Sequence, residues 1–107
     1  MQADYQDGLV FDALGNPVRR GIIRLLAERP RTVGSIAAEF PISRPAISKH
    51  LQVLEGAALV RHRRVGTRNE FRLDQEGFAG ARDWLDQFWD DALARLALVA
   101  GNTPEGS

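Results

Sequence analysis

The side chains best suited to chemistry lie between Ser43 and Arg72, and they are basic and polar. From Ser43 to Gln52 the chain carries two serines, an arginine, a lysine, a histidine and a glutamine. Such side chains find hydrogen-bond partners on base edges in the major groove of DNA, which is about 12 Å wide and admits a helix. A second basic group follows, consisting of Arg61, Arg63, Arg64, Arg68 and Arg72. The combination predicts contact with a nucleic acid.

A helix is expected to position the first group. Ser43 can accept hydrogen bonds from the free amides of the first turn, and Pro45 fits that turn because it lacks an N–H. Gly56 can adopt the left-handed conformation that ends a helix. One apolar stripe at i, i+4 and i+7 faces a core, and it comprises Ile47, Leu51 and Leu54. The polar residues therefore fall on other faces and stay free to touch a partner.

A β-hairpin over residues 59–73 is expected to position the second group. Two extended runs, LVRHRR and RNEFRL, are joined by Val65, Gly66 and Thr67. A helix beside an arginine-rich hairpin is the winged helix-turn-helix arrangement, in which the helix enters the major groove and the wing reaches phosphates or the minor groove. The helix alone would fit an ordinary amphipathic surface helix equally well. The hairpin is what favours DNA.

Three helices are expected before this unit. A short apolar stripe over residues 8–16 predicts the first, and the Asn16-Pro17 pair supplies a cap and first residue for the second. Gly21 weakens the second helix and suggests that another helix packs closely there. Thr32 can cap a third helix that runs through Phe40, so that residues 32–56 form the helix-turn-helix. The fold class is mainly α-helical with a β-hairpin wing, in one domain over residues 1–107.

The last helix, over residues 75–100, carries a wide apolar stripe. Asp74 can cap it, and Gly77 and Gly80 loosen its beginning. The small core made by the earlier helices has limited room for this stripe, so pairing with a second copy is expected, although packing within one chain stays an alternative. The expected dimer residues are Leu9, Val10, Phe11, Leu85, Phe88, Trp89, Leu93 and Leu96. Residues 1–7 and 101–107 are expected to be flexible.

The net charge of zero hides a segregation of charge along the chain. Residues 17–72 hold twelve Arg or Lys against four Glu, whereas residues 1–16 and 73–107 are acidic. A basic middle between acidic ends predicts a surface for a polyanion. The absence of cysteine excludes disulfides, thiolate metal sites and a cysteine nucleophile. No long apolar run or signal-like start is present, so a cytoplasmic protein that does not enter the membrane is expected.

Three motifs resemble the ArsR family of bacterial winged-helix repressors. FDALGNPVRRGIIRLLAE resembles its second-helix signature, SRPAISKHLQVLEGAALV its recognition helix, and VRHRRVGTRNEFRL its wing. The resemblance, from about Leu9 to Val99, implies a homodimer joined through the first and last helices. Such a dimer binds an imperfect inverted repeat in double-stranded DNA and blocks transcription, often of its own gene. Carried over by position, the base-reading face comprises Ser43, Arg44, Pro45, Ala46, Ser48, Lys49 and His50, with Gln52 at its edge.

Some of these residues have more than one expected role. Phosphate contacts, which fix the register on DNA without reading its sequence, are also expected from Ser43, Ser48 and Lys49. Arg64 and Arg68 flank the wing tip and are expected to contact the minor groove or phosphates. His50 has an alternative, in which it lies half inside the domain and only orients the helix.

The chain departs from the family at its metal sites. Many members bind metal through a Cys-x-Cys element whose positions here are Thr32 and Gly34. Others use carboxylates with histidine on the last helix, where this chain has no histidine and offers Asp83, Asp86, Asp90 and Asp91. Because zinc, nickel and cobalt sites usually include imidazole or thiolate, we expect no metal and no cofactor, and the effector stays open.

Two other functions are possible for a chain with these residues, namely catalysis and protein binding. An enzyme is not expected, because Ser43 or Ser48 near His50 lacks an orienting third residue, and no Gly-x-Ser-x-Gly motif or phosphate-binding glycine loop is present. A winged helix can also serve as a protein-interaction module without sequence-specific DNA binding. The number of arginines on the helix and wing favours DNA over that alternative.

Overall fold

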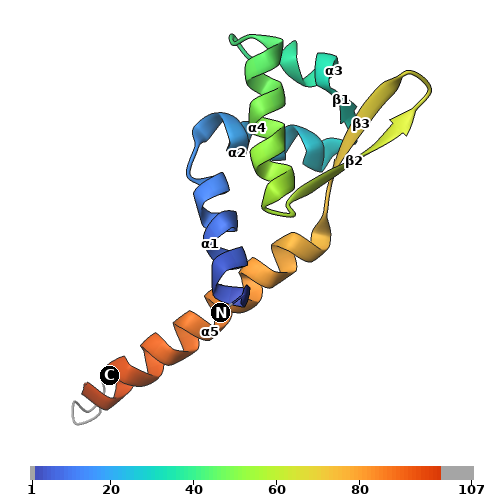
Figure 1. The fold of residues 1–107 in the computed structure, drawn as a ribbon. Coiled ribbons are helices and arrows are strands. Elements are labelled where there is room, and N and C mark those ends of the chain that lie inside the picture. Colours follow the sequence, from blue (N-terminus) through green and yellow to red (C-terminus); the bar gives the residue numbers. More distant parts are fainter. Residues whose placement is uncertain (1, 100–107) are drawn as a thin grey trace.

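The computed structural model describes residues 2–99, with side chains from residue 8 onward. The helical winged helix-turn-helix expected from the sequence is confirmed, with one additional strand (Figure 1). The elements in chain order are α1 (Gln2–Leu14), α2 (Pro17–Glu28), β1 (Arg31–Thr32), α3 (Val33–Ala37), α4 (Arg44–Gly56), β2 (Val60–Val65), β3 (Arg68–Leu73) and α5 (Gln75–Val99). The expected flexible segment 101–107 lies outside the described residues.

Helix starts follow the capping residues that the sequence indicates. The side-chain oxygen of Asn16 accepts hydrogen bonds from the amides of Val18 and Arg19 at 2.8 and 3.1 Å. Thr32 caps α3 by accepting from the amide of Ser35, and Ser43 caps α4 by accepting from Ala46, both at 3.2 Å. These bonds satisfy amides that have no partner within the helix. They fix where α2, α3 and α4 begin.

Two helix boundaries differ from the sequence-based expectation. α1 already begins at Gln2, so the expectation that residues 1–7 are loose is wrong for Gln2 to Asp7, a run of mostly helix-compatible residues that simply extends the helix. α3 ends at Ala37 rather than Phe40. The amides of Glu39 and Phe40 bond to carbonyls three residues back, which tightens the chain into the turn before α4.

The end of α4 also differs from expectation. Gly56 is part of the helix, and Ala58 has the left-handed conformation, with φ 62°. The amide of Leu59 donates to the carbonyl of Leu54 at 3.0 Å, and that of Ala58 donates to Glu55 at 2.9 Å, which is the Schellman pattern. Leu54 and Leu59 are both fully buried. Their contact with the core, rather than a glycine, sets the point where the chain reverses.

We expect Ala58→Gly to stabilise the protein by about 0.5–1 kcal/mol, because left-handed backbone strains a residue with a Cβ. Gly56→Ala is expected to stabilise as well, by up to about 1 kcal/mol, because a Cβ at this helical position meets nothing within 4 Å. Urea unfolding midpoints of the two variants measure both effects. If both substitutions destabilise, the left-handed residue is Gly56 and this description of the turn is incorrect.

The wing belongs to a three-stranded antiparallel sheet with the strand order β1-β3-β2. In the hairpin Val60 is opposite Leu73 and Val65 is opposite Arg68, and Gly66 in the turn has φ 64°. β1 was not expected from the sequence, and it pairs Arg31 with Phe71. This short strand joins the base of the wing to the start of α3. Strand β3 of the wing is therefore paired on both sides, with β1 and with β2.

The core lies between α1, α2, α4 and the base of the sheet. Its fully buried members include Ile22, Ile36, Ile47, Leu51 and Leu54. Gly21 is needed because a Cβ there would lie 2.9 Å from the ring of Phe40, so the packing is close as expected, but the neighbour lies in the turn after α3 and not in a helix. Val10 is only 1% exposed, so its assignment to a dimer interface is wrong. Val10 and Ala13 are the buried core residues of α1, and the half-buried Leu9, Phe11 and Leu14 pack against the same core.

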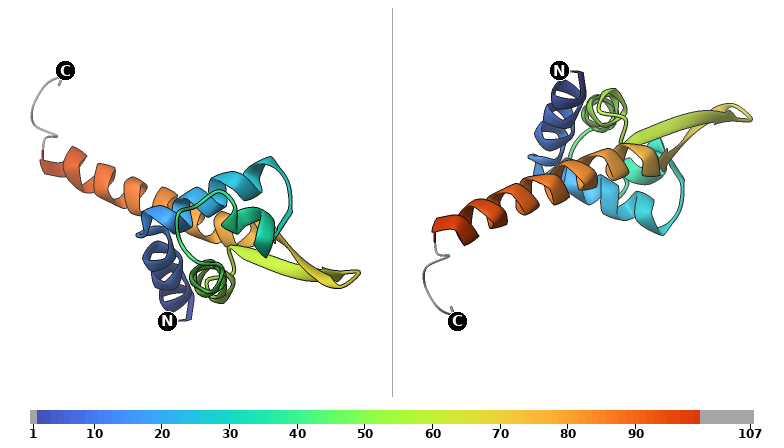
Figure 2. Two further views of the ribbon diagram at one scale, coloured as in Figure 1. Left: turned by 90° about the horizontal axis from the view of Figure 1, so that it is seen from above. Right: turned by 90° about the horizontal axis from the view of Figure 1, so that it is seen from below.

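The last helix projects from this core. Figure 2 shows the later turns of α5 extending beyond the rest of the fold in both views. The radius of gyration is 18.4 Å, against about 13 Å for a compact domain of this length. Of its residues only Ala81 is buried, and the exposed large apolar side chains are Trp84, Leu85, Phe88, Trp89, Leu93, Leu96, Leu98 and Val99. Apart from the contact of Trp84 with Phe11, these side chains remain largely exposed in the single chain.

Candidate nucleic-acid interface

The first half of α4 presents most of its expected contact residues to solvent. The buried stripe of Ile47, Leu51 and Leu54 anchors the helix, as its spacing predicts. Exposed residues are Ser43, Arg44, Pro45, Lys49 and Gln52, and half-buried ones are Ala46, Ser48 and His50. Pro45, Lys49 and Gln52 recur at i, i+4 and i+7, so they share the outward face of the helix. That face of α4 is the one that can enter the major groove of DNA.

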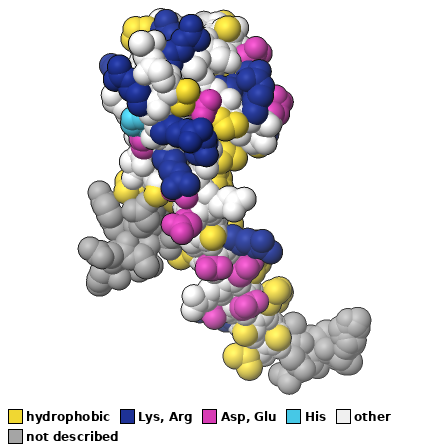
Figure 3. All heavy atoms as spheres, turned by 90° about the vertical axis from the view of Figure 1, so that its right-hand side faces the viewer, with side chains coloured by type: hydrophobic (Ala, Val, Ile, Leu, Met, Phe, Trp, Pro, Cys, Tyr) yellow, Lys and Arg dark blue, Asp and Glu magenta, His cyan; other side chains and the backbone are white. Residues whose placement is uncertain are grey.

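The wing adds cations beside this helix. Arg64 and Arg68 are exposed on either side of the turn, and the Arg64 Nε donates to the carbonyl of Gly66 at 3.2 Å. Within the described part of the chain no acidic side chain pairs with Arg44, Lys49, Arg64 or Arg68. Figure 3 shows many Lys and Arg side chains on the winged-helix part of the molecule, and several Asp and Glu side chains along α5. Cations without acidic partners in the described residues therefore lie on both α4 and the wing tip.

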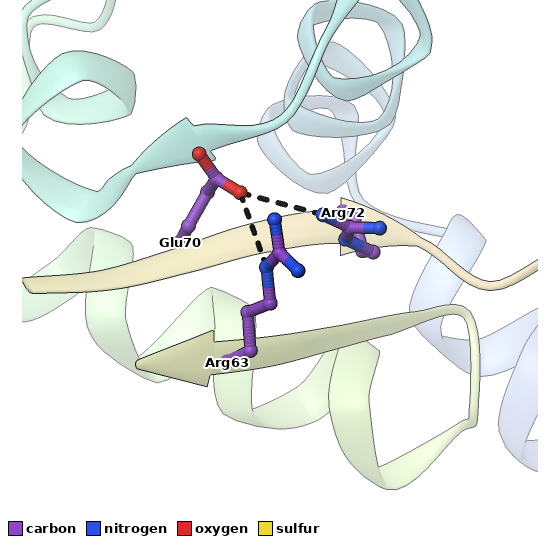
Figure 4. A network of polar contacts seen from close by, with 3 residues as sticks. All are labelled: Arg63, Glu70 and Arg72. Atoms are coloured by element: carbon purple, nitrogen blue, oxygen red, sulfur yellow. Dashed lines mark hydrogen bonds and ion pairs between the residues drawn. The ribbon is translucent and has the colours of Figure 1, made fainter. Parts of the chain in front are cut away.

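Two other wing arginines, Arg63 and Arg72, share one carboxylate. Glu70 Oε1 lies 3.4 Å from Nη2 of Arg72 and 3.7 Å from Nε of Arg63, so one carboxylate joins both strands (Figure 4). Arg63 and Glu70 are direct cross-strand partners. Opposite charges at this spacing stabilise a strand pair by about 0.2–1 kcal/mol. We infer that Arg63 and Arg72 stiffen the wing, whereas Arg64 and Arg68 remain available at its tip.

A second contact ties the wing to α4. Nδ1 of His62 on β2 lies 2.6 Å from Oε2 of Glu55 near the end of α4. The His62 ring also packs on Phe71, with ring centroids 5.0 Å apart. The contact between Glu55 and His62 was not predicted from the sequence, because these residues lie on different elements whose packing the spacing of residues does not show. This pair holds the base of the wing against the helix.

Two arginines of the basic segment support the fold. Arg19 Nε donates to the carbonyl of Ala13 at 2.7 Å, and its Nη2 donates to that of Asp12 at 3.2 Å, at the end of α1. Arg31 is only 8% exposed and donates to Glu28 at 2.9 Å. The positive charge counted over residues 17–72 is therefore larger than the charge that this segment presents to a partner.

The contact of His50 favours the structural alternative for that residue. Nη1 of Arg19 lies 3.2 Å from Nδ1 of His50, which must accept because a guanidinium only donates. This bond links α4 to the junction of α1 and α2. Burial first, and the Arg19 charge second, lower the pKa of His50 from its usual 6.5.

His50 is expected to make stability depend on pH. Because its pKa is lower in the folded state, the unfolded chain binds more protons just below pH 6.5, so its contribution is present above that pH and is lost on acidification. Urea unfolding of the protein and of His50→Gln at pH 8 and pH 5.5 measures this. The unsubstituted protein should lose more stability than the variant. Equal losses would remove His50 as the cause.

The described residues contain neither a group of potential metal ligands nor a helix that could span a membrane. No group of three or more potential metal-binding side chains comes together there. None of the described helices has the length and apolarity needed to span a membrane.

The comparisons with known proteins agree with this geometry. A family model described as a helix-turn-helix domain matches residues 14–63. The HTH-type transcriptional regulator Rv2034 of Mycobacterium tuberculosis is 46% identical over 89 residues, which cover 83% of each chain.

Solved structures extend the match to the last helix. The ArsR-like transcriptional regulator from Rhodococcus sp. RHA1 is 26% identical, with a TM-score of 0.88 over 98% of this chain and 99% of that one. The homodimeric winged helix-turn-helix DNA-binding domain Mb0332 from Mycobacterium bovis is 31% identical, with a TM-score of 0.64 over 92% and 85%. The chain belongs to the ArsR family of winged helix-turn-helix transcriptional regulators, a family of DNA-binding proteins and not of enzymes.

Proposed function

We propose that the chain is a homodimeric cytoplasmic repressor that binds an inverted-repeat operator, including one at its own gene. The observation that carries this proposal is a set of cations on α4 and the wing tip that have no acidic partner among the described side chains and lie beside an outward helix face. In this arrangement α4 enters the major groove and Arg64 and Arg68 contact phosphates or the minor groove. Occupying the operator blocks transcription.

The exposed face of α5 supports the dimer. Trp89 is 56% exposed and Leu96 is 60% exposed, values that a water-soluble chain rarely sustains over a contiguous patch. An apolar hollow of about 810 Å³ lies between α1, α2 and α5, with Phe11, Leu14, Leu85 and Trp89 in its lining. The similar Mb0332 domain is homodimeric. We infer that α5 of a second copy covers the hollow and the stripe of Leu85, Phe88, Trp89, Leu93 and Leu96.

Dimerisation sets the distance between the two copies of α4 that contact DNA. Two symmetric copies of α4 read two half-sites about one helical turn apart, which is why dimeric helix-turn-helix proteins bind inverted repeats. Leu9 and Phe11 remain half-exposed beside α5 and border the second copy. Phe11 is already in edge contact with Trp84 of its own chain, with ring centroids 5.3 Å apart. α1 therefore supports the dimer helix from within its own subunit.

A salt series on DNA tests the proposed function. A dimer that contacts about 6–10 phosphates should lose roughly 10³–10⁵-fold in affinity between 50 and 200 mM salt. Binding to fragments of the chain's own upstream region and to random DNA is measured by anisotropy over that range. Steep dependence with tighter binding to one upstream fragment is expected. Absence of binding, or affinity that does not change with salt, would favour a protein-interaction module instead.

A further inference from the structure

An open groove of about 570 Å³ lies between the helix-turn-helix and the tip of the wing. One wall is formed by the start of α3, the other by the wing tip, and Arg44 lines it from the first turn of α4. The lining residues are Thr32, Val33, Gly34, Ser35, Arg44, Thr67, Arg68 and Asn69. The groove thus brings together hydroxyl and amide side chains and two arginines, without a carboxylate. This donor set matches a phosphate group.

The arginine of α4 lies across the backbone of α3. A Cβ placed on Gly34 would be 2.6 Å from Nη2 of Arg44 and 3.3 Å from its Cζ. The guanidinium therefore occupies the space that any other residue at position 34 would fill. Glycine at this position is explained by that contact, because Gly34 has an ordinary helical location and no left-handed backbone.

The direction of Arg44 separates it from the outward face of α4. Arg44 and Ser48 are one turn apart, and each lines a groove that the wing residue Asn69 also lines. The outward face, in contrast, carries Pro45 and Lys49, and Gln52 lies at the edge between the two because it lines the second groove as well. Arg44 consequently faces the wing, where Arg68 approaches from the opposite wall. Two cations without acidic partners in the described residues meet across one groove.

We propose that this groove holds one phosphate of the DNA backbone between Arg44 and Arg68, and that Gly34 is the positioning residue that lets Arg44 reach it. The inference rests on the proposed function and deepens it. It moves Arg44 from the base-reading set, where the family resemblance placed it, to a phosphate contact. Sequence discrimination on α4 then falls to Lys49 on the outward face and to Gln52 at its edge. A phosphate contact fixes register and contributes equally on any sequence.

The test combines Gly34→Ala, Arg44→Ala and the double variant. The added methyl at position 34 meets only the flexible end of Arg44, and alanine is the better helix former, so the thermal midpoint should stay the same or rise. Affinity for operator and for random duplex is measured at several salt concentrations. Gly56→Ala is the matched control, because its Cβ meets nothing within 4 Å.

We expect Arg44→Ala to weaken both duplexes by the same factor and to lower the salt slope by about 0.9 per subunit, the value for one lost phosphate contact. Gly34→Ala should weaken both duplexes without loss of stability, and should have no effect when Arg44 is already alanine. A loss confined to the operator with an unchanged slope would overturn the inference and return Arg44 to base reading. Normal binding by Gly34→Ala would also overturn it. If the unsubstituted protein binds neither duplex, the proposed function itself fails.

Discussion

Trp89→Ala is expected to convert the proposed dimer into a monomer at micromolar concentration. Trp89 is 56% exposed in a single subunit and lies on the apolar stripe of α5, so its burial has to come from a second copy. Truncating a buried interface tryptophan costs about 2–4 kcal/mol, and the two-fold symmetry applies that cost twice. The dimer dissociation constant should therefore rise at least a thousandfold. Sedimentation equilibrium measures it directly.

Loss of the dimer should also reduce operator affinity by orders of magnitude, because one subunit reaches only one half-site. The matched control is Leu98→Ala. Leu98 is 81% exposed and lies nine residues beyond Trp89, about two and a half turns, which places it on the opposite side of α5. This variant should sediment as the unsubstituted protein does. If Trp89→Ala also sediments unchanged, the apolar stripe is not the dimer interface.

Gly77→Ala is expected to lower the free energy of unfolding by more than about 3 kcal/mol. A Cβ at Gly77 would collide with the carbonyl oxygen of Ala58 and lie 2.6 Å from its carbonyl carbon, and both are backbone atoms. Relief requires α5 to move away from the turn between α4 and β2. That turn also holds α5 through the hydrogen bond from the Asp74 amide to the carbonyl of Leu59, at 2.9 Å. Such overpacking removes a large fraction of a typical stability of 5–15 kcal/mol.

Thermal unfolding followed by circular dichroism measures the effect of Gly77→Ala, and a fall in the midpoint of roughly 12–24 °C is expected for a domain of this size. Gly80→Ala on the same helix is the matched control, because its Cβ meets nothing within 4 Å. It should leave the midpoint unchanged or raise it slightly. Equal midpoints for Gly77→Ala and the unsubstituted protein would show that α5 does not rest on the turn at Ala58.

The local features of the fold were predictable from the sequence. Asn16, Thr32 and Ser43 cap helices through bonds to amides two or three residues later, so both partners lie within one short stretch. The buried stripe of α4 follows directly from its spacing. β1 was not predictable, because two residues show no periodicity and their partner strand lies far along the chain. The same holds for Ala58, whose left-handed backbone is imposed by the burial of Leu59.

The candidate interface was predictable as a region, but not residue by residue. The basic segment contains arginines of three kinds, which composition alone cannot separate. Arg19 and Arg31 support the fold, Arg63 shares a carboxylate within the wing, and Arg64 has no acidic partner in the described residues. Only the positions of Ala13, Glu28 and Glu70 in space distinguish them. Gly77 illustrates the same limit, because it was expected only to loosen α5 and instead allows a close backbone approach.

A footprint of the purified protein on its own upstream DNA tests the central claim most directly. The claim is that a pair of subunits joined through α5 presents two copies of α4, each with an arginine-bearing wing, to one side of the duplex. We predict two protected half-sites in inverted orientation, with centres about one helical turn apart. Protection of a single half-site, or of none at low salt, would contradict it.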